Sequence, residues 1–129
     1  MAARNLAPVR ALQRELIPIV GSFAPNGSSA VAASSRKGPG WSVARTSAGL
    51  FTITLTDKWN DFVSGSATAQ LATAADINAQ LGVWTAASKT ITIRLIAVAT
   101  ETDVAADANN RVHFTLWMRN TSVVPTRGT

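Results

Sequence analysis

His113 is the only histidine of the chain, and the chain contains no cysteine. A Ser-His-acid triad would therefore need His113 as its general base. This histidine lies between Val112 and Phe114 in an alternating stretch, and no Gly-X-Ser-X-Gly elbow is present to expose a serine nucleophile. The pattern favours a histidine on the outer face of a strand over a catalytic base.

Two pairs of acidic residues, Asp57 with Asp61 and Asp103 with Asp107, are each separated by four positions. Such spacing aligns two carboxylates only on a helix, whereas these pairs are expected at a strand end and in a loop. Alanines interrupt the second pair, which therefore lacks the further oxygen ligands of a calcium loop. Glycine-rich phosphate-binding motifs are absent as well. We expect neither an enzyme, nor a metal site, nor a cofactor.

The size and composition indicate a single small domain. The chain has 129 residues, of which 47% are hydrophobic and only 15% charged. Its first 20 residues include charged side chains where a signal peptide needs an unbroken apolar run, and no stretch approaches the length of a membrane span. We expect a soluble protein without an export signal, although the lack of cysteine leaves the compartment open.

The net charge of +5 is concentrated in the first 47 residues, where six basic residues face one acid, so that 6 − 1 = +5. The basic residues of this region are Arg4, Arg10, Arg14, Arg36, Lys37 and Arg45. A neutral body with a basic arm suggests attachment to an acidic protein or nucleic acid. Equally, sparse arginines can simply keep a segment rich in Ser and Ala soluble. Nucleic acid is the less favoured partner, because its binding domains usually cluster more basic residues and interleave them with aromatics.

Residues 1–40 are expected to form an N-terminal arm. The apolar spacing predicts a short helix from Pro8 to Ile17, ended by Pro18. A short apolar piece follows from Ile19 to Phe23, and the Pro, Asn, Gly and Ser residues of Ala24 to Gly40 predict a long surface loop.

Residues 41–129 are expected to form an antiparallel β domain. The strongest signal is the strict alternation of Phe51, Ile53 and Leu55 with threonines. The predicted elements are a hairpin of Trp41–Arg45 with Leu50–Thr56, a weaker strand at Ser66–Ala72, a helical turn or loop at Asp76–Val83, and two long strands at Lys89–Ala99 and Arg111–Arg119. The fold class is mostly β, an antiparallel β-sandwich or small barrel with jelly-roll, Greek-key or meander connections.

The outward residues of the two long strands are unusually apolar. Trp117 alternates out of phase with Phe114, Leu116 and Met118, which are expected to face the core. It therefore belongs either to a second covered face or to a subunit interface, where Trp and Arg are favoured. The predicted oligomer interface comprises Ile96, Val98, Trp117 and Arg119.

Three stretches carry a resemblance to a known class of protein: GSFAPNGSSA (21–30), GWSVARTSAGLFTITLTDKW (40–59) and DVAADANNRVHFTLWMRNTSV (103–123). They resemble small head decoration, or cement, proteins of tailed bacteriophages. The resemblance implies a structural virion protein on the outer surface of the capsid, a homotrimer that clamps neighbouring major capsid subunits. It supplies no catalytic residues. The predicted attachment residues on the arm are Arg4, Arg10, Arg14, Arg36 and Lys37, and no membrane contact is expected.

Two other classes of function stay open at this stage. A nucleic-acid-binding β domain would use the basic residues of the first 47 positions, and its affinity would fall steeply with salt. A tail or host-surface module that binds glycans would use exposed tryptophans to stack on sugars.

Overall fold

The protein is described by a computed structural model that covers residues 16–56, 59 and 61–119. These residues form eight strands and one short 3-10 helix. In chain order they are β1 (Leu16–Phe23), η1 (Ala33–Ser35), β2 (Trp41–Ser47), β3 (Leu50–Leu55), β4 (Asp61–Gln70), β5 (Asn78–Thr85), β6 (Thr90–Ala97), β7 (Thr100–Glu101) and β8 (Arg111–Arg119).

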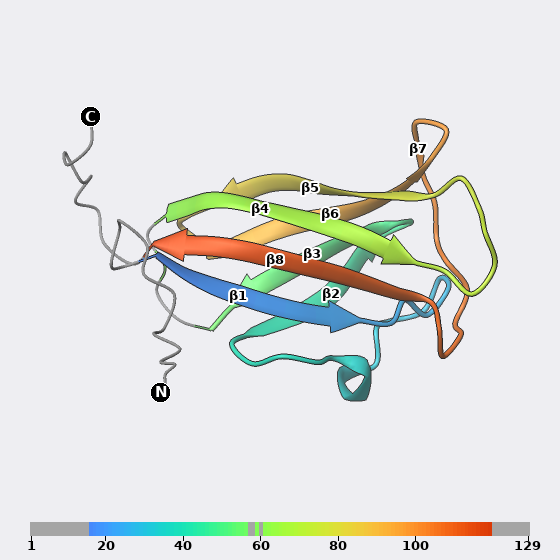
Figure 1. Cartoon of the computed structure of the whole chain (residues 1–129), viewed down its shortest axis with the longest axis horizontal. Helices are drawn as coiled ribbons and strands as arrows, with labels where there is room; N and C mark the ends of the chain where they lie inside the picture. The colour runs from blue at the N-terminus through green and yellow to red at the C-terminus, as the bar shows by residue number, and fades with distance from the viewer. Residues whose placement is uncertain (1–15, 57–58, 60, 120–129) are drawn as a thin grey trace, which may run out of the picture.

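The strands form two antiparallel sheets that stack as a β-sandwich (Figure 1). The front sheet has the order β1-β8-β4, so the first and last strands of the described chain are neighbours. The rear sheet has the order β2-β3-β6-β5, with the short β7 paired to β6. The predicted fold class is therefore confirmed, and the two separate hydrogen-bonded sheets favour the sandwich over the barrel.

The core lies between the two sheets and follows from the alternation of the strands. Each of β3, β6 and β8 buries every second residue, and these side chains are large and apolar. An aromatic cluster at one edge joins the layers, with the Phe23 and Phe51 rings 5.1 Å apart and the Trp41 and Phe114 rings 4.8 Å apart. The hairpin of β2 with β3 and the boundaries of β8 agree with the sequence prediction.

The prediction for Leu16 and Ile17 was wrong: they open strand β1 instead of ending a helix, while residues 8–15 lie outside the described residues. Ser22 exchanges backbone hydrogen bonds with Lys37, which shows that the even-numbered residues of β1 turn their polar backbone groups away from β8. The missing N–H of Pro18 therefore falls on the open edge, where proline is tolerated. Because β1 pairs with β8 along its length, residues 16–23, which the sequence assigned to the arm, are part of the sandwich.

The prediction of a helical turn or loop at Asp76–Val83 was also wrong. Asn78–Thr85 is strand β5, paired with β6 and interrupted by a register shift between Leu81 and Trp84. The spacing of Ile77 and Leu81 fits a helix and a strand equally well, and pairing with β6 decides between them. Of the weaker strand predicted at Ser66–Ala72, the residues up to Gln70 are part of the longer β4, whereas Leu71 and Ala72 follow its end.

The long connection from Ala24 to Gly40 runs over the surface, as predicted, but it is anchored. The guanidinium of Arg111 donates to the Ser22 hydroxyl at 3.0 Å and to the Ser35 carbonyl at 2.6 Å. These bonds tie β8, β1 and helix η1 together. The part of the predicted arm that the structure describes is therefore fixed to the sandwich.

Candidate functional site

The outward side of the front sheet is an open surface, which we call the front face. Directly paired residues of antiparallel strands point to the same side, and Leu116 and its alternate neighbours on β8 face the core. The other residues of β8 and their partners therefore face outward. The front face comprises Leu16, Pro18, Val20 and Ser22 on β1, Arg111, His113, Thr115, Trp117 and Arg119 on β8, Asp61, Ser64, Ser66, Thr68 and Gln70 on β4, and Lys37, which bridges to Ser22 at the edge of β1. No described segment crosses in front of these strands (Figure 1).

The apolar end of the front face surrounds Trp117. Its partners across the two ladders are Pro18 on β1 and Ser64 on β4. On the same side of β1, Val20 is 57% exposed and Leu16 lies on the far side of Pro18. An apolar patch of this kind, centred on a tryptophan, is typical of protein interfaces.

An ion pair borders the apolar end. The Arg119 guanidinium donates to a carboxylate oxygen of Asp61, its partner across the β4–β8 ladder. The side chain of Arg119 is only 13% exposed, so the pair is largely shielded from water on the arginine side. Together these two residues add no net charge to the front face.

The middle of the front face is lined by small hydroxyl residues, Ser66 and Thr68 on β4 and Thr115 on β8. Two shallow hollows meet there at His113, one toward β4 and one toward Lys37. The Nε2 atom of His113 lies 2.7 Å from the Oε1 atom of Gln70. His113 therefore occupies the outer face of a strand, as the sequence predicted.

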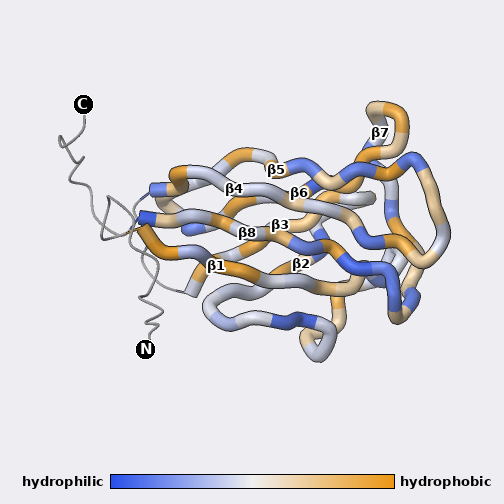
Figure 2. The backbone as a smooth tube through the Cα atoms, viewed as in Figure 1, coloured by the Kyte–Doolittle hydropathy of each residue, from blue (hydrophilic) through white to orange (hydrophobic). Residues whose placement is uncertain are grey.

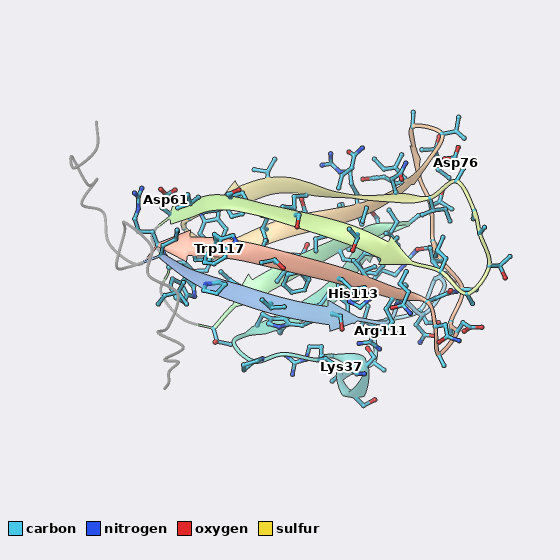
Figure 3. The ribbon with its side chains drawn as sticks, in the orientation of Figure 1. Lys37, Asp61, Asp76, Arg111, His113 and Trp117 are labelled. Carbon is cyan, nitrogen blue, oxygen red and sulfur yellow. The ribbon has the colours of Figure 1, made fainter. Side chains whose placement is uncertain are left out.

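The opposite end of the front face is basic. Lys37 pairs with Ser22 through an isolated bridge at the edge of β1, and Arg111 begins β8 beside it (Figure 3). Hydropathy along the backbone follows the same gradient, from the apolar start of β1 to the hydrophilic start of β8 (Figure 2). The structure thus brings two residues with different predicted roles, Lys37 and Trp117, to one surface.

Arg36 is not part of this surface, although the sequence grouped it with Lys37. Its guanidinium lies 5.6 Å from the centre of the Trp41 ring and donates to the Trp41 carbonyl. These contacts hold the start of β2 and leave Arg36 poorly placed to bind a partner. The three other predicted attachment residues, Arg4, Arg10 and Arg14, lie outside the described residues.

The four residues predicted as one oligomer interface lie on two sides of the sandwich. Trp117 and Arg119 face outward from the front sheet, whereas Ile96 faces outward from the rear sheet and Val98 forms the turn between β6 and β7. A cyclic trimer joins two different patches of each copy, so residues on two sides of the sandwich can meet across one contact. The oligomer interface therefore stays a prediction.

Arg45 is likewise not available for binding. Its Nε and Nη2 atoms lie 3.0 Å and 2.7 Å from the two carboxylate oxygens of Asp103, and the Gly49 N–H donates to the same carboxylate at 3.0 Å. The hydrogen bond from Arg45 lowers the pKa of Asp103, the Gly49 N–H lowers it further, and partial burial opposes both. The pair fastens the β2–β3 hairpin to the loop before β8, so Asp103 has a structural role.

Comparison with protein-family models, curated proteins and solved structures finds no match to this chain. Within the part of the chain that the structure describes, no group of three or more His, Cys, Asp or Glu side chains is placed to hold a metal ion. No helix among these residues is long and apolar enough to cross a membrane.

Trp117 and Lys37 were predicted from the sequence as functional residues, whereas Pro18 and Val20 were not. Their signal was the alternation of Ile17, Ile19 and Gly21 with Pro18, Val20 and Ser22, which assigns one set to each face once the segment is read as a strand. A proline within the segment argued for a helix end and concealed this alternation.

Proposed function

We propose that the chain is a structural virion protein that binds the outside of a bacteriophage capsid and clamps neighbouring major capsid subunits. The resemblance of three sequence stretches to phage decoration proteins suggests this class of function. The observation that carries the proposal is the front face, an uncovered sheet surface with an apolar end around Trp117 and a basic end at Lys37. Such a surface suits attachment to another protein.

The N-terminal segment would extend this attachment. Residues 1–15 directly precede Leu16 in the chain. Leu16 lies at the apolar end of the front face, opposite Arg119. Residues 1–15 contribute Arg4, Arg10 and Arg14 against Glu15, a charge of 3 − 1 = +2. The front face and this segment together would contact an acidic surface over a longer path than the sandwich alone.

The resemblance also implies a trimer. Three copies around one position of the capsid would combine weak single contacts through their high effective concentration, so no single contact needs to be large. A ligand that binds only the intact capsid lattice stabilises it, because breaking the lattice must also release the ligand.

The test is to add the purified protein to capsids of its phage that lack it. We expect the protein to co-sediment with the capsids and to raise the temperature at which they release DNA. If the protein does not co-sediment at micromolar concentration, the proposal is wrong. If it instead binds free DNA with an affinity that falls steeply with salt, the nucleic-acid alternative takes its place.

A further inference from the structure

We infer that the front face is the side that meets the capsid, that it recognises an apolar patch with an acidic rim, and that it does not pair with the front face of a second copy. This inference rests on the proposed function and deepens it. It also implies that the rear sheet points away from the capsid, toward solvent.

The first argument is the charge of the front face. Arg119 is balanced by Asp61, whereas no carboxylate among the described residues forms an ion pair with Lys37 or Arg111. The front face therefore carries a net charge of 3 − 1 = +2, from these three cations and one acid. A partner with acidic groups at the corresponding end would neutralise this charge.

The same charge argues against a second copy as the occupant. Two front faces in contact would together carry four positive charges in excess, partly removed from water. Like charges brought together in an interface select against that pairing.

The second argument is the position of the apolar end. Pro18, the partner of Trp117, precedes Ser22, the partner of Lys37, by four residues, which is about 13 Å along a strand. The capsid surface should therefore offer a pocket or flat apolar area for Trp117 and acidic side chains roughly this far away. The apolar contact supplies affinity, and the charges fix the orientation.

The third argument is the size of the front face. Eight residues of β1 and three strands span about 26 Å by about 14 Å, an area of roughly 370 Å². This footprint fits a modest single contact of the kind that several copies on one capsid can combine.

The rear sheet lacks the excess positive charge of the front face, although Ile96 faces outward from it and Val83 on β5 is 69% exposed. Its outward side places Thr52 opposite Thr92 and Thr54 opposite Thr90. Arg94 on this side is 3.5 Å from the carboxylate of Glu101, which balances its charge. This side therefore offers an acidic partner no unbalanced positive charge among the residues that pair here.

Two matched pairs of variants test the inference with the full chain and undecorated capsids. Lys37→Gln on the front face and Gln80→Glu on the rear sheet each lower the net charge by one. Val20→Ser on the front face and Val83→Ser, which replaces a valine 69% exposed on β5, each remove an exposed valine. The measurement is the dissociation constant from co-sedimentation at low and moderate salt.

We expect Lys37→Gln to weaken binding about three- to fivefold at low salt and to flatten the salt dependence, because a rim charge contributes modestly and is screened. We expect Val20→Ser to weaken binding about tenfold, and both rear variants to bind as the wild type does. If the rear variants weaken binding as much as the front variants, the inference is overturned while the proposed function stands.

A separate measurement tests whether a second copy covers the front face. Sedimentation equilibrium of the wild type and of Val20→Ser without capsids shows whether the front face mediates self-association. An oligomer that Val20→Ser converts to monomers would show that a second copy covers this face, and would overturn the inference. Failure of the wild type to bind capsids at all would instead overturn the proposed function.

Discussion

Arg45 binds both carboxylate oxygens of Asp103 across 58 positions of sequence, with its Nε and Nη2 atoms at 3.0 Å and 2.7 Å. The side chains are 20% and 23% exposed, so the pair is partly shielded from water. Gly49, which donates to the same carboxylate, has a φ of +65°, and an added Cβ there would lie 2.5 Å from the Thr102 nitrogen. This contact explains how a short hairpin is locked against a distant loop.

The pair predicts a loss of stability in acid. Because the pKa of Asp103 is lower in the folded chain than in the unfolded chain, its contribution is fully present above the unfolded pKa of about 3.9 and disappears as the pH falls through the folded pKa. Asp103→Asn should therefore be less stable than the wild type at neutral pH, and the difference should shrink below about pH 4. Chemical denaturation at pH 7 and pH 3 measures it. A difference that is constant with pH would show that the pair contributes by packing alone.

A close approach between the sheets predicts that Gly21 tolerates no side chain. A Cβ at this position would lie 2.6 Å from three atoms of the Trp41 ring. Gly21→Ala should lower the free energy of unfolding by about 2 kcal/mol, because the ring must shift in a packed core. Measurement is by urea denaturation.

The control for Gly21 is a double variant with Trp41→Phe. The smaller ring makes room for the methyl group, and the Nε1–H of Trp41, which finds no acceptor among the described residues, is removed with it. The combined loss should be clearly smaller than the sum of the two single losses. Additive losses would mean that the two residues do not compete for space.

The turn between β6 and β7 predicts a stabilising change. Val98 and Ala99 have φ values of 49° and 66°, the signature of a two-residue type I′ hairpin turn, which favours Asn-Gly. Val98 is 80% exposed, so replacing it removes little packing. Val98→Asn with Ala99→Gly should raise the free energy of unfolding by about 1 kcal/mol in thermal or urea denaturation.

The same variant tests whether Val98 belongs to an interface, as the sequence predicted. Strain in a β-branched residue is often retained because the residue binds something. If the stabilised variant binds capsids and sediments as the wild type does, Val98 has no part in an interface. A loss of capsid binding would place the turn in the contact and contradict the assignment of the rear side to solvent.

Much of the fold was predictable, because the inward residues of β3, β6 and β8 alternate without interruption. Phe51, Ile53 and Leu55 show the two-residue period of a strand directly. Glycine and proline residues indicate the long loop before Trp41. Strand β5 was not predictable in this way, since Ile77 and Leu81 fit two periods and only pairing with β6 selects one. Local sequence carries no information about that partner.

Some residues of the front face were predictable from the sequence, but the way in which strand pairing brings them together was not. Trp117 was identified by its phase on β8, yet sequence alone cannot say that Ile96 lies on the other sheet. That assignment depends on which strands pair over distances of more than 80 residues, as β1 and β8 do. For the same reason Lys37 and Trp117 became one surface only when β1 was placed at the edge of the front sheet.

The final prediction separates the attachment segment from the sandwich by two truncations. Deleting residues 2–15 removes Arg4, Arg10, Arg14 and Glu15 but leaves β1 whole. We expect this variant to unfold cooperatively near the wild-type temperature and to lose most of its affinity for capsids at low salt, because the front face alone is small. Deleting residues 2–20 also removes five residues of β1, including buried Ile19, and exposes the edge of β8 that pairs with it. The longer deletion should therefore lose its cooperative unfolding transition, whereas a body confined to residues 41–129 would tolerate both. Thermal unfolding by circular dichroism and capsid co-sedimentation, applied to both variants, distinguish these outcomes: a shorter truncation that still binds capsids as the wild type does would show that the segment before Leu16 has no part in attachment.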